Sequence, residues 1–226
     1  MRGRSVHIKA VDFNVWLDSI APGANLSQVS RRSAMSLSTL STQRSHDRIP
    51  PKSILAIARS YGKNPVKELS QFEGFEFLTV RPASLTSLVP LYSALDLLHE
   101  QFVREGRAIR NEKPLLVPSD ALKRWVNEIR GVMTQKELAS NLEVQQGNFS
   151  RELSTGDMSF MRVVEIGNVL GVNPVVGLVA SGELSFDDVF GCSMLQYLEQ
   201  VSDESLLEAL FRAQNFLTTD LKALVS

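Results

Sequence analysis

The segment from Gln145 to Ser154 combines amide and hydroxyl side chains with an arginine, and only Val144 and Phe149 are apolar enough to anchor its first half. Short polar side chains on the exposed face of a helix can reach base edges in the major groove of DNA. Amides pair with adenine through two hydrogen bonds, arginine binds guanine or a phosphate, and glycine lets the backbone come close. The candidate contacts here are Gln145, Gln146, Gly147, Asn148, Arg151 and Ser154.

The same arrangement occurs earlier in the chain. With a constant shift of 109 positions, Asp12–Leu69 aligns with Ala121–Leu178 without a gap, Trp16 aligns with Trp125, and the match continues weakly beyond these ranges. The chain therefore contains two copies of one unit. The polar segment of the first copy offers Ser36, Leu37, Ser38, Thr39, Thr42, Gln43 and Arg44 as candidate contacts with bases or phosphates.

Positive charge is concentrated in the first copy. Residues 1–70 hold eleven Lys and Arg against four Asp and Glu, whereas residues 181–226 hold two against eight. This imbalance favours a polyanionic partner. Helix amino termini expected at Asn25 and Thr134 would add amide donors for phosphate oxygens, and the basic arm from Arg2 to Arg4 could enter a minor groove. Further candidate phosphate contacts are Arg31, Arg32, Arg48 and Lys52.

The apolar spacing is helical throughout and indicates an all-α protein. In the second copy we expect four helices. The first covers Ala121–Ile129, and the second begins at a capping box of Thr134 and Glu137. The third begins at about Gln145, and the fourth covers Met161–Leu170. The first copy repeats the pattern, with Asn25 and Gln28 as the capping pair and a helix over Lys52–Tyr61.

Four segments follow from this pattern. We expect a first domain over 1–71, a connector over 72–118, a second domain over 119–181 and an acidic helical tail over 182–226. Leucines at three- and four-residue steps predict one long amphipathic helix over Ser84–Arg110, kinked at Pro90. The helices in 84–110 and 194–224 would cover their own domains, join the two units, or form the seam of a homodimer.

The run Met133–Arg151 resembles the helix-turn-helix of the lambda-repressor/Cro-like family. The family pattern is roughly Leu-Thr-Gln-x-x-Leu-Ala, four residues, a small apolar residue and a polar recognition helix. The residues that fill it here are Thr134, Gln135, Leu138, Ala139, Val144, Phe149 and Ser150. Val29–Ser41 resembles the same motif, and the resemblance covers about 58 residues of each copy. It implies two tandem domains that bind double-stranded DNA.

The first copy departs from the family pattern at one position. Leu26 stands where the second copy has Gln135, so the phosphate-binding amide would come from Ser27 or Gln28. Moving the alignment of this segment by one residue would match Leu26, Ser27 and Gln28 to the family pattern, but it would break the constant shift of 109 positions. The second copy matches the family motif better than the first but lacks its excess of positive charge, so it either binds DNA weakly or serves another role.

Other classes of protein find little support. The single cysteine, Cys192, excludes an intrachain disulfide, and three scattered histidines predict no metal site. The sequence has no glycine-rich phosphate loop and no recognisable acid–base pair, so we expect no enzyme and no cofactor. The amino terminus lacks a signal peptide and no apolar run is long enough to span a membrane, which predicts a cytoplasmic, nucleoid-associated protein.

The sequence thus predicts a sequence-specific transcriptional regulator, most simply a repressor of phage or prophage type. Its two polar helices differ, LSTLSTQ against QGNFSRE, which favours a monomer on an asymmetric or bipartite site, loosely like some actinobacterial phage immunity repressors. In the alternative hypothesis only the first domain binds DNA. The second unit and the tail would then serve dimerisation or partner binding, as in an antitoxin or a sensor.

Overall fold

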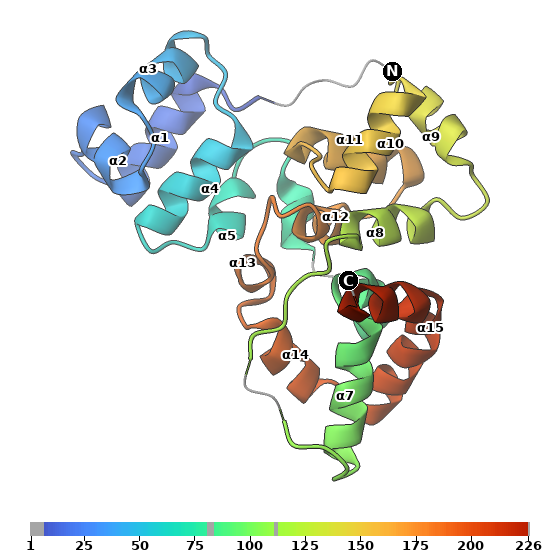
Figure 1. Cartoon of the computed structure of the whole chain (residues 1–226). Coiled ribbons are helices and arrows are strands. Elements are labelled where there is room, and N and C mark those ends of the chain that lie inside the picture. Colours follow the sequence, from blue (N-terminus) through green and yellow to red (C-terminus); the bar gives the residue numbers. More distant parts are fainter. Residues whose placement is uncertain (1–6, 81–83, 111–112, 226) are drawn as a thin grey trace. The chain divides into compact units, whose positions relative to one another are not determined.

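A computed structural model describes residues 7–80, 84–110 and 113–225, with side chains to Leu217 in the last helix (Figure 1). The described residues form helices and one isolated bridge between Ile8 and Ile49, with no strand among them. The predicted all-α class is therefore confirmed. The chain divides into two compact units, Met1–Val80 and Arg81–Ser226.

Unit 1 is built around the apolar faces of five α-helices and one 3-10 turn. These are α1 (Ala10–Ile20), α2 (Leu26–Ser33), α3 (Leu37–Ser45), α4 (Pro51–Ser60), α5 (Pro65–Leu69) and η1 (Glu76–Thr79). Phe13, Trp16 and Leu17 lie at three- and four-residue steps of α1 and are all buried. Helix α4 packs against α2 and α5, and α1 contacts α3.

Unit 2 contains the remaining helices. They are α6 (Leu85–Leu88), η2 (Val89–Leu91), α7 (Ala94–Arg104), α8 (Ala121–Ile129), α9 (Gln135–Asn141), α10 (Gln146–Thr155), α11 (Phe160–Leu170), α12 (Val175–Ala180), α13 (Phe186–Phe190), α14 (Met194–Gln200) and α15 (Asp203–Val225). Helix α8 contacts α10, α12 and η2, while α15 contacts α6, η2 and α7.

The constant shift of 109 positions holds for the helices as well as for the residues. Five pairs begin 109 positions apart, namely α2 and α9, α3 and α10, α4 and α11, α6 and α14, and α7 and α15. The tail segments, in which the sequence match is weak, therefore belong to the repeat. Serines at equivalent positions precede the paired tail helices, with Ser84 and Ser193 before the first pair and Ser93 and Ser202 before the second.

The long helix predicted over Ser84–Arg110 is wrong. The chain instead forms α6, η2 and α7, because Pro90 has no amide hydrogen to continue the helix and the Ser93 side chain accepts the Leu95 amide to begin α7. Leu85, Leu88 and Leu91 are buried all the same. Their spacing therefore reflects burial in unit 2 and not a continuous helix.

The domain limits also fall differently from the segments expected. Unit 1 extends to Val80, and Phe72, Phe75 and Leu78 beyond the expected limit at residue 71 are buried. The described residues from Ser84 to Arg110 belong to unit 2, where α6 and α7 pack against α15. The acidic tail is not a separate segment, because it completes the same unit.

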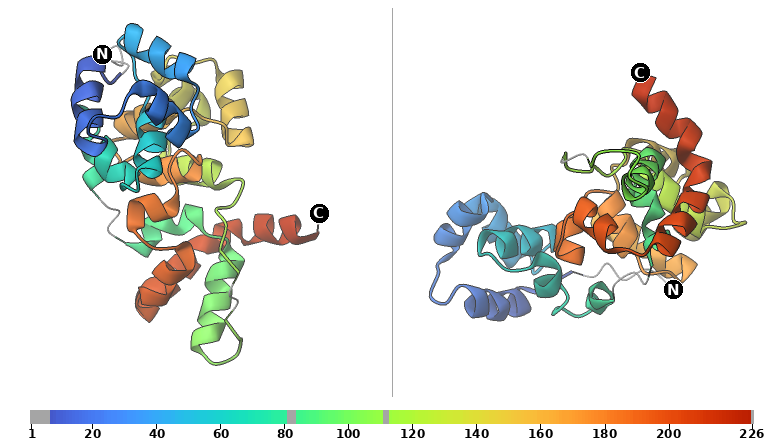
Figure 2. Two further views of the ribbon diagram at one scale, coloured as in Figure 1. Left: turned by 90° about the vertical axis from the view of Figure 1, so that its left-hand side faces the viewer. Right: turned by 90° about the horizontal axis from the view of Figure 1, so that it is seen from below.

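The tails of the two copies pack against each other within unit 2. Helices α7 and α15 lie side by side (Figure 2), with Leu97 of α7 and Leu206 of α15 fully buried. The Tyr92 hydroxyl donates to the Met194 carbonyl oxygen at 3.1 Å, and burial raises the pKa of this phenol. The two segments considered for a homodimer seam thus contact each other inside one chain.

A buried carboxylate joins the two tails electrostatically. Glu100, 2% exposed, accepts from Arg104 Nε at 3.0 Å and from Arg110 at 2.9 Å. Arg104 also donates to Asp203 and to the carbonyl oxygens of Leu198 and Val201. Because these bonds connect α7 with the chain around α14 and α15, they fix the packing of the tails.

We expect Glu100→Gln to lower the free energy of unfolding of unit 2 by about 2 kcal/mol, because two partly buried guanidinium groups lose their shared counter-charge. Urea denaturation followed by circular dichroism measures the change. Glu105→Gln is the matched control, since the Glu105–Arg107 pair is largely exposed and its loss should leave the transition unchanged. Equal midpoints of urea denaturation for wild type and Glu100→Gln would contradict a stabilising role of Glu100 between the two tails.

Candidate nucleic-acid interface

Local hydrogen bonds fix both the start of α2 and the turn between α2 and α3. The Asn25 side chain accepts from the Gln28 amide at 3.0 Å and Gln28 Oε1 accepts from the Asn25 amide at 2.9 Å, so the expected capping pair is present. Ala34 adopts a left-handed φ of 55°, and Ser30 Oγ donates to the Met35 carbonyl oxygen at 2.6 Å. Helix α3 is thereby held in one orientation on α2.

Helix α3 presents a polar face to solvent. Leu40 is its buried anchor, at 1% exposure, whereas Leu37 is 46% exposed at the first position of the helix. Ser36 caps the helix by accepting the Thr39 amide at 3.0 Å, and its hydroxyl also contacts the hydroxyls of Ser38 and Thr39. The predicted contacts that are fully on the exposed face are Ser36, Leu37, Ser38, Thr39 and Thr42.

Two predicted contacts are engaged inside unit 1. Gln43 is half-buried and its Oε1 accepts from Ser53 Oγ at 2.9 Å, which ties α3 to α4. Arg32 Nε donates to the Ser60 carbonyl oxygen at 2.8 Å, and its guanidinium lies 4.4 Å from the centre of the Tyr61 ring. Both side chains therefore contribute to the packing of unit 1, Gln43 between α3 and α4 and Arg32 between α2 and the end of α4.

Four other predicted basic contacts of unit 1 are available for a polyanion. Arg31 on α2, Arg48 after α3 and Lys52 on α4 are exposed, and Arg44 at the end of α3 is half-buried. None of the four forms a salt bridge with any described residue. Ser27, together with the capping pair, is exposed at the amino end of α2. The predicted arm from Arg2 to Arg4 lies outside the described residues.

Unit 2 repeats this geometry with different side chains. Thr134 and Glu137 form the expected capping box, and the hydrogen bond from the Thr134 amide lowers the pKa of Glu137. Glu143 has a left-handed φ of 56°, at the position equivalent to Ala34. Phe149 is the fully buried anchor of α10 and is equivalent to Leu40. The exposed predicted contacts are Thr134, Gln145, Gln146, Gly147, Asn148, Arg151 and Ser154, and Gln135 is half-buried.

The electrostatic character of this second surface differs from the first. Glu137, Glu143 and Glu152 stand where unit 1 has Gln28, Ala34 and Gln43, and all five basic side chains of the first surface are replaced by neutral or acidic ones. Lys136 and Arg151 are the compensating cations, exposed and without a salt bridge to any described residue. Lys136 is not among the predicted contacts, although it lies between Gln135 and Glu137 in α9.

Most of the other described arginines of unit 2 are bound by carboxylates of the same unit, whereas Arg130 donates to Asn127 Oδ1 and to the Met133 carbonyl oxygen. Buried Arg124 pairs with Asp120 at 2.7 Å, Arg162 pairs with Glu165 at 2.7 Å, and Arg212 pairs with Glu128 at 3.1 Å. Desolvation raises the pKa of Glu128, and the bond to Arg212 only partly opposes this shift. Positive charge in unit 2 thus mainly neutralises its own acidic groups.

Among the described residues, no group of three or more His, Cys, Asp or Glu is placed to hold a metal ion. Within the same ranges, every helix is too short or too polar to cross a membrane. No protein-family model, no curated protein and no solved structure matches the chain.

Gly147 gives a direct test of whether the exposed face of α10 contacts a ligand. A Cβ atom at this position would meet nothing within 4 Å, so we expect Gly147→Ala to raise the free energy of unfolding by about 0.5–1 kcal/mol. DNA affinity, measured by fluorescence anisotropy, should fall if backbone approaches the bases here. If the variant is more stable and binds DNA as well as wild type, the exposed face of α10 is an ordinary solvated surface and not a DNA contact.

Proposed function

We propose that the chain binds double-stranded DNA in a sequence-selective way, with α3 and α10 as its two base-reading helices. The observation that carries the proposal is the repeated pair of helices around a left-handed turn, in which one or two buried anchors leave most of the second helix exposed and polar. Side chains of this kind, on a helix held by its partner, suit the major groove.

Charge supports the same partner for unit 1. Arg31 on α2, Arg44 on α3, Arg48 after α3 and Lys52 on α4 have no salt bridge to any described residue. Contacts of these cations with phosphates would supply affinity and strong salt dependence, while Ser38, Thr39 and Thr42 would supply selectivity. The resemblance to lambda-repressor/Cro-like proteins adds the role of a transcriptional regulator, most simply a repressor of phage type.

The two helices would read different sequences. Each chain carries LSTLSTQ on α3 and QGNFSRE on α10, so one chain suffices for a bipartite, asymmetric site. Selection of bound sequences from a random DNA library, followed by the light-scattering mass of the complex, tests this directly. We expect two dissimilar half-sites occupied by one chain; a strict palindrome occupied by two chains would contradict the arrangement.

The contributions of the two helices can be separated by matched triple variants. Replacing Ser38, Thr39 and Thr42 by Ala should weaken binding to the selected site about 100-fold, and replacing Gln146, Asn148 and Arg151 by Ala should weaken it about tenfold, because base contacts are each worth about 1–3 kcal/mol and the second surface is less basic. Both measurements use the same salt concentration, since phosphate contacts depend on it. Unchanged affinity in the second variant would contradict the two-helix arrangement.

A second candidate function keeps DNA binding for unit 1 alone. The carboxylates of Glu137, Glu143 and Glu152 around α10 favour it, because they would repel phosphates. Unit 2 would then serve dimerisation or partner binding. The α10 triple variant decides between the candidates: under this one it loses neither affinity nor selectivity, while the α3 triple variant loses both.

A further inference from the structure

Leu37, the first residue of α3, is an apolar side chain on a surface that otherwise carries hydroxyl groups. Leu40, the other leucine of the helix, is buried at 1% exposure, whereas 46% of Leu37 is exposed. Packing within unit 1 therefore accounts for Leu40 but only for part of Leu37. The other exposed residues of α3 are all serine or threonine, namely Ser38, Thr39, Ser41, Thr42 and Ser45.

The hydroxyl groups at the start of α3 are bonded to one another. Ser36 Oγ accepts the Thr39 amide at 3.0 Å and lies 2.6 Å from Thr39 Oγ1 and 3.0 Å from Ser38 Oγ. A ligand that bonds these hydroxyls must compete with this network. Contact with Leu37 has no such cost, because it only removes apolar surface from water.

The equivalent residue of the second copy is Gln146, the first residue of α10. The chain enters both helices with the same backbone geometry, since the preceding residue has φ −68° and ψ 141° at Ser36 and φ −69° and ψ 131° at Gln145. The left-handed residues Ala34 and Glu143 stand three positions before the first residue of each helix, with φ 55° and 56°. The two copies therefore place different chemistry, apolar in one and amide in the other, at one position of the same motif.

The bases offer a different partner to each of these side chains. In the major groove thymine presents its C5 methyl group, which apolar side chains contact. Leucine has neither donor nor acceptor, so it cannot select a base by hydrogen bonds. Adenine presents the N7 acceptor and the N6 amino donor, which a glutamine amide binds together. Gln146 is exposed, and its side chain has no hydrogen bond with any described residue.

We propose that this position sets the base preferred by each helix, an inference that rests on the proposed function. Leu37 contacts the C5 methyl group of a thymine in the half-site of α3, and Gln146 pairs with an adenine in the half-site of α10. The two half-sites then differ at the base pair that faces this position. Because 5-methylcytosine carries the same methyl group, α3 also prefers it to cytosine at that base pair.

The first test uses the wild-type chain and changes only the DNA. In the selected site, the half-site of α3 is the part whose preference is lost when Ser38, Thr39 and Thr42 are replaced by Ala. Each thymine there is replaced in turn by uracil, which lacks the methyl group. We expect one replacement to weaken binding about fourfold in fluorescence anisotropy, as the burial of one methyl group predicts. At the same place, 5-methylcytosine should bind more tightly than cytosine by a similar factor.

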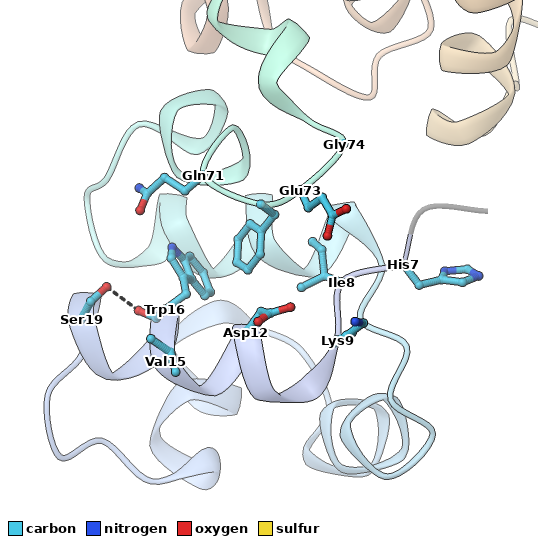
Figure 3. Close-up of a pocket in the computed structure, with 11 residues that line it drawn as sticks. His7, Ile8, Lys9, Asp12, Val15, Trp16, Ser19, Gln71, Glu73 and Gly74 are labelled. Carbon is cyan, nitrogen blue, oxygen red and sulfur yellow. Dashed lines mark hydrogen bonds between the residues drawn. The ribbon is translucent and has the colours of Figure 1, made fainter. Parts of the chain in front are cut away.

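The second test changes the side chain. Leu37→Ala should bind the thymine and uracil sites with more nearly equal affinity, because most of the contact with the methyl group is lost. Leu37→Gln introduces the side chain that α10 carries at this position and should change the preferred base from thymine to adenine. Val15→Ala is the matched control, since Val15 is 70% exposed on α1 of the same unit and lies outside α3 (Figure 3). It should keep the wild-type preference for thymine.

Gln146 is tested in the same way with a different base analogue. The adenines in the half-site of α10 are replaced in turn by 7-deazaadenine, which lacks the N7 acceptor. One replacement should weaken binding of the wild-type chain about fivefold, as the loss of one hydrogen bond predicts. The same replacement should leave binding of Gln146→Ala unchanged.

The outcomes distinguish this inference from the proposed function. If no sequence is selected, the proposed function fails and the inference fails with it. If a sequence is selected but its α3 half-site has no thymine or responds to no uracil, the role of Leu37 is overturned while sequence-selective binding stands. An equal loss on uracil for wild type and Leu37→Ala overturns it as well. An equal loss on 7-deazaadenine for wild type and Gln146→Ala overturns the role of Gln146.

Discussion

The burial of a few apolar side chains, Leu40 in α3 and Phe149 and Leu153 in α10, is the interaction on which the proposed DNA-binding surface depends. A helix anchored at so few points leaves most of its residues free to be polar. The anchor needs support from outside the helix, and it receives it from a left-handed turn residue and a capped preceding helix. Two copies that differ in most exposed residues retain this set of constraints, so the surface chemistry can change while the framework stays.

The two copies use positive charge in different ways. In unit 1 several exposed cations on α2, after α3 and on α4 have no carboxylate partner among the described residues. In unit 2 arginines are bound within the fold, for example in the network of Glu100 with Arg104 and Arg110. This network holds the tails together, because desolvated charges must be paired. A single net charge of −1 therefore conceals one surface open to a polyanion and one unit, residues 81–226, in which 19 Asp and Glu outnumber 13 Lys and Arg.

The repeat also explains why the copies are not equivalent in packing. The tails of both copies meet in unit 2, and the turn η2 covers α8 there. The indole of Trp125 packs over Gly177, where an added Cβ would lie 2.4 Å from the ring, whereas the equivalent Trp16 donates to the buried carboxylate of Glu68 at 2.9 Å. The residues that pack against the two equivalent tryptophans therefore differ between the two cores.

The sequence by itself determined the helical class, both capping boxes, the buried anchors and the exposed polar residues of α3 and α10, because periodicity and capping are local properties of the chain. It did not determine the break at Pro90, since buried leucines in short turns have the same spacing as those in a helix. Only the tertiary structure decided that Gln43 and Arg32 are engaged within unit 1 and that the tails pack together. These features depend on contacts between residues far apart in the chain, which no local pattern encodes.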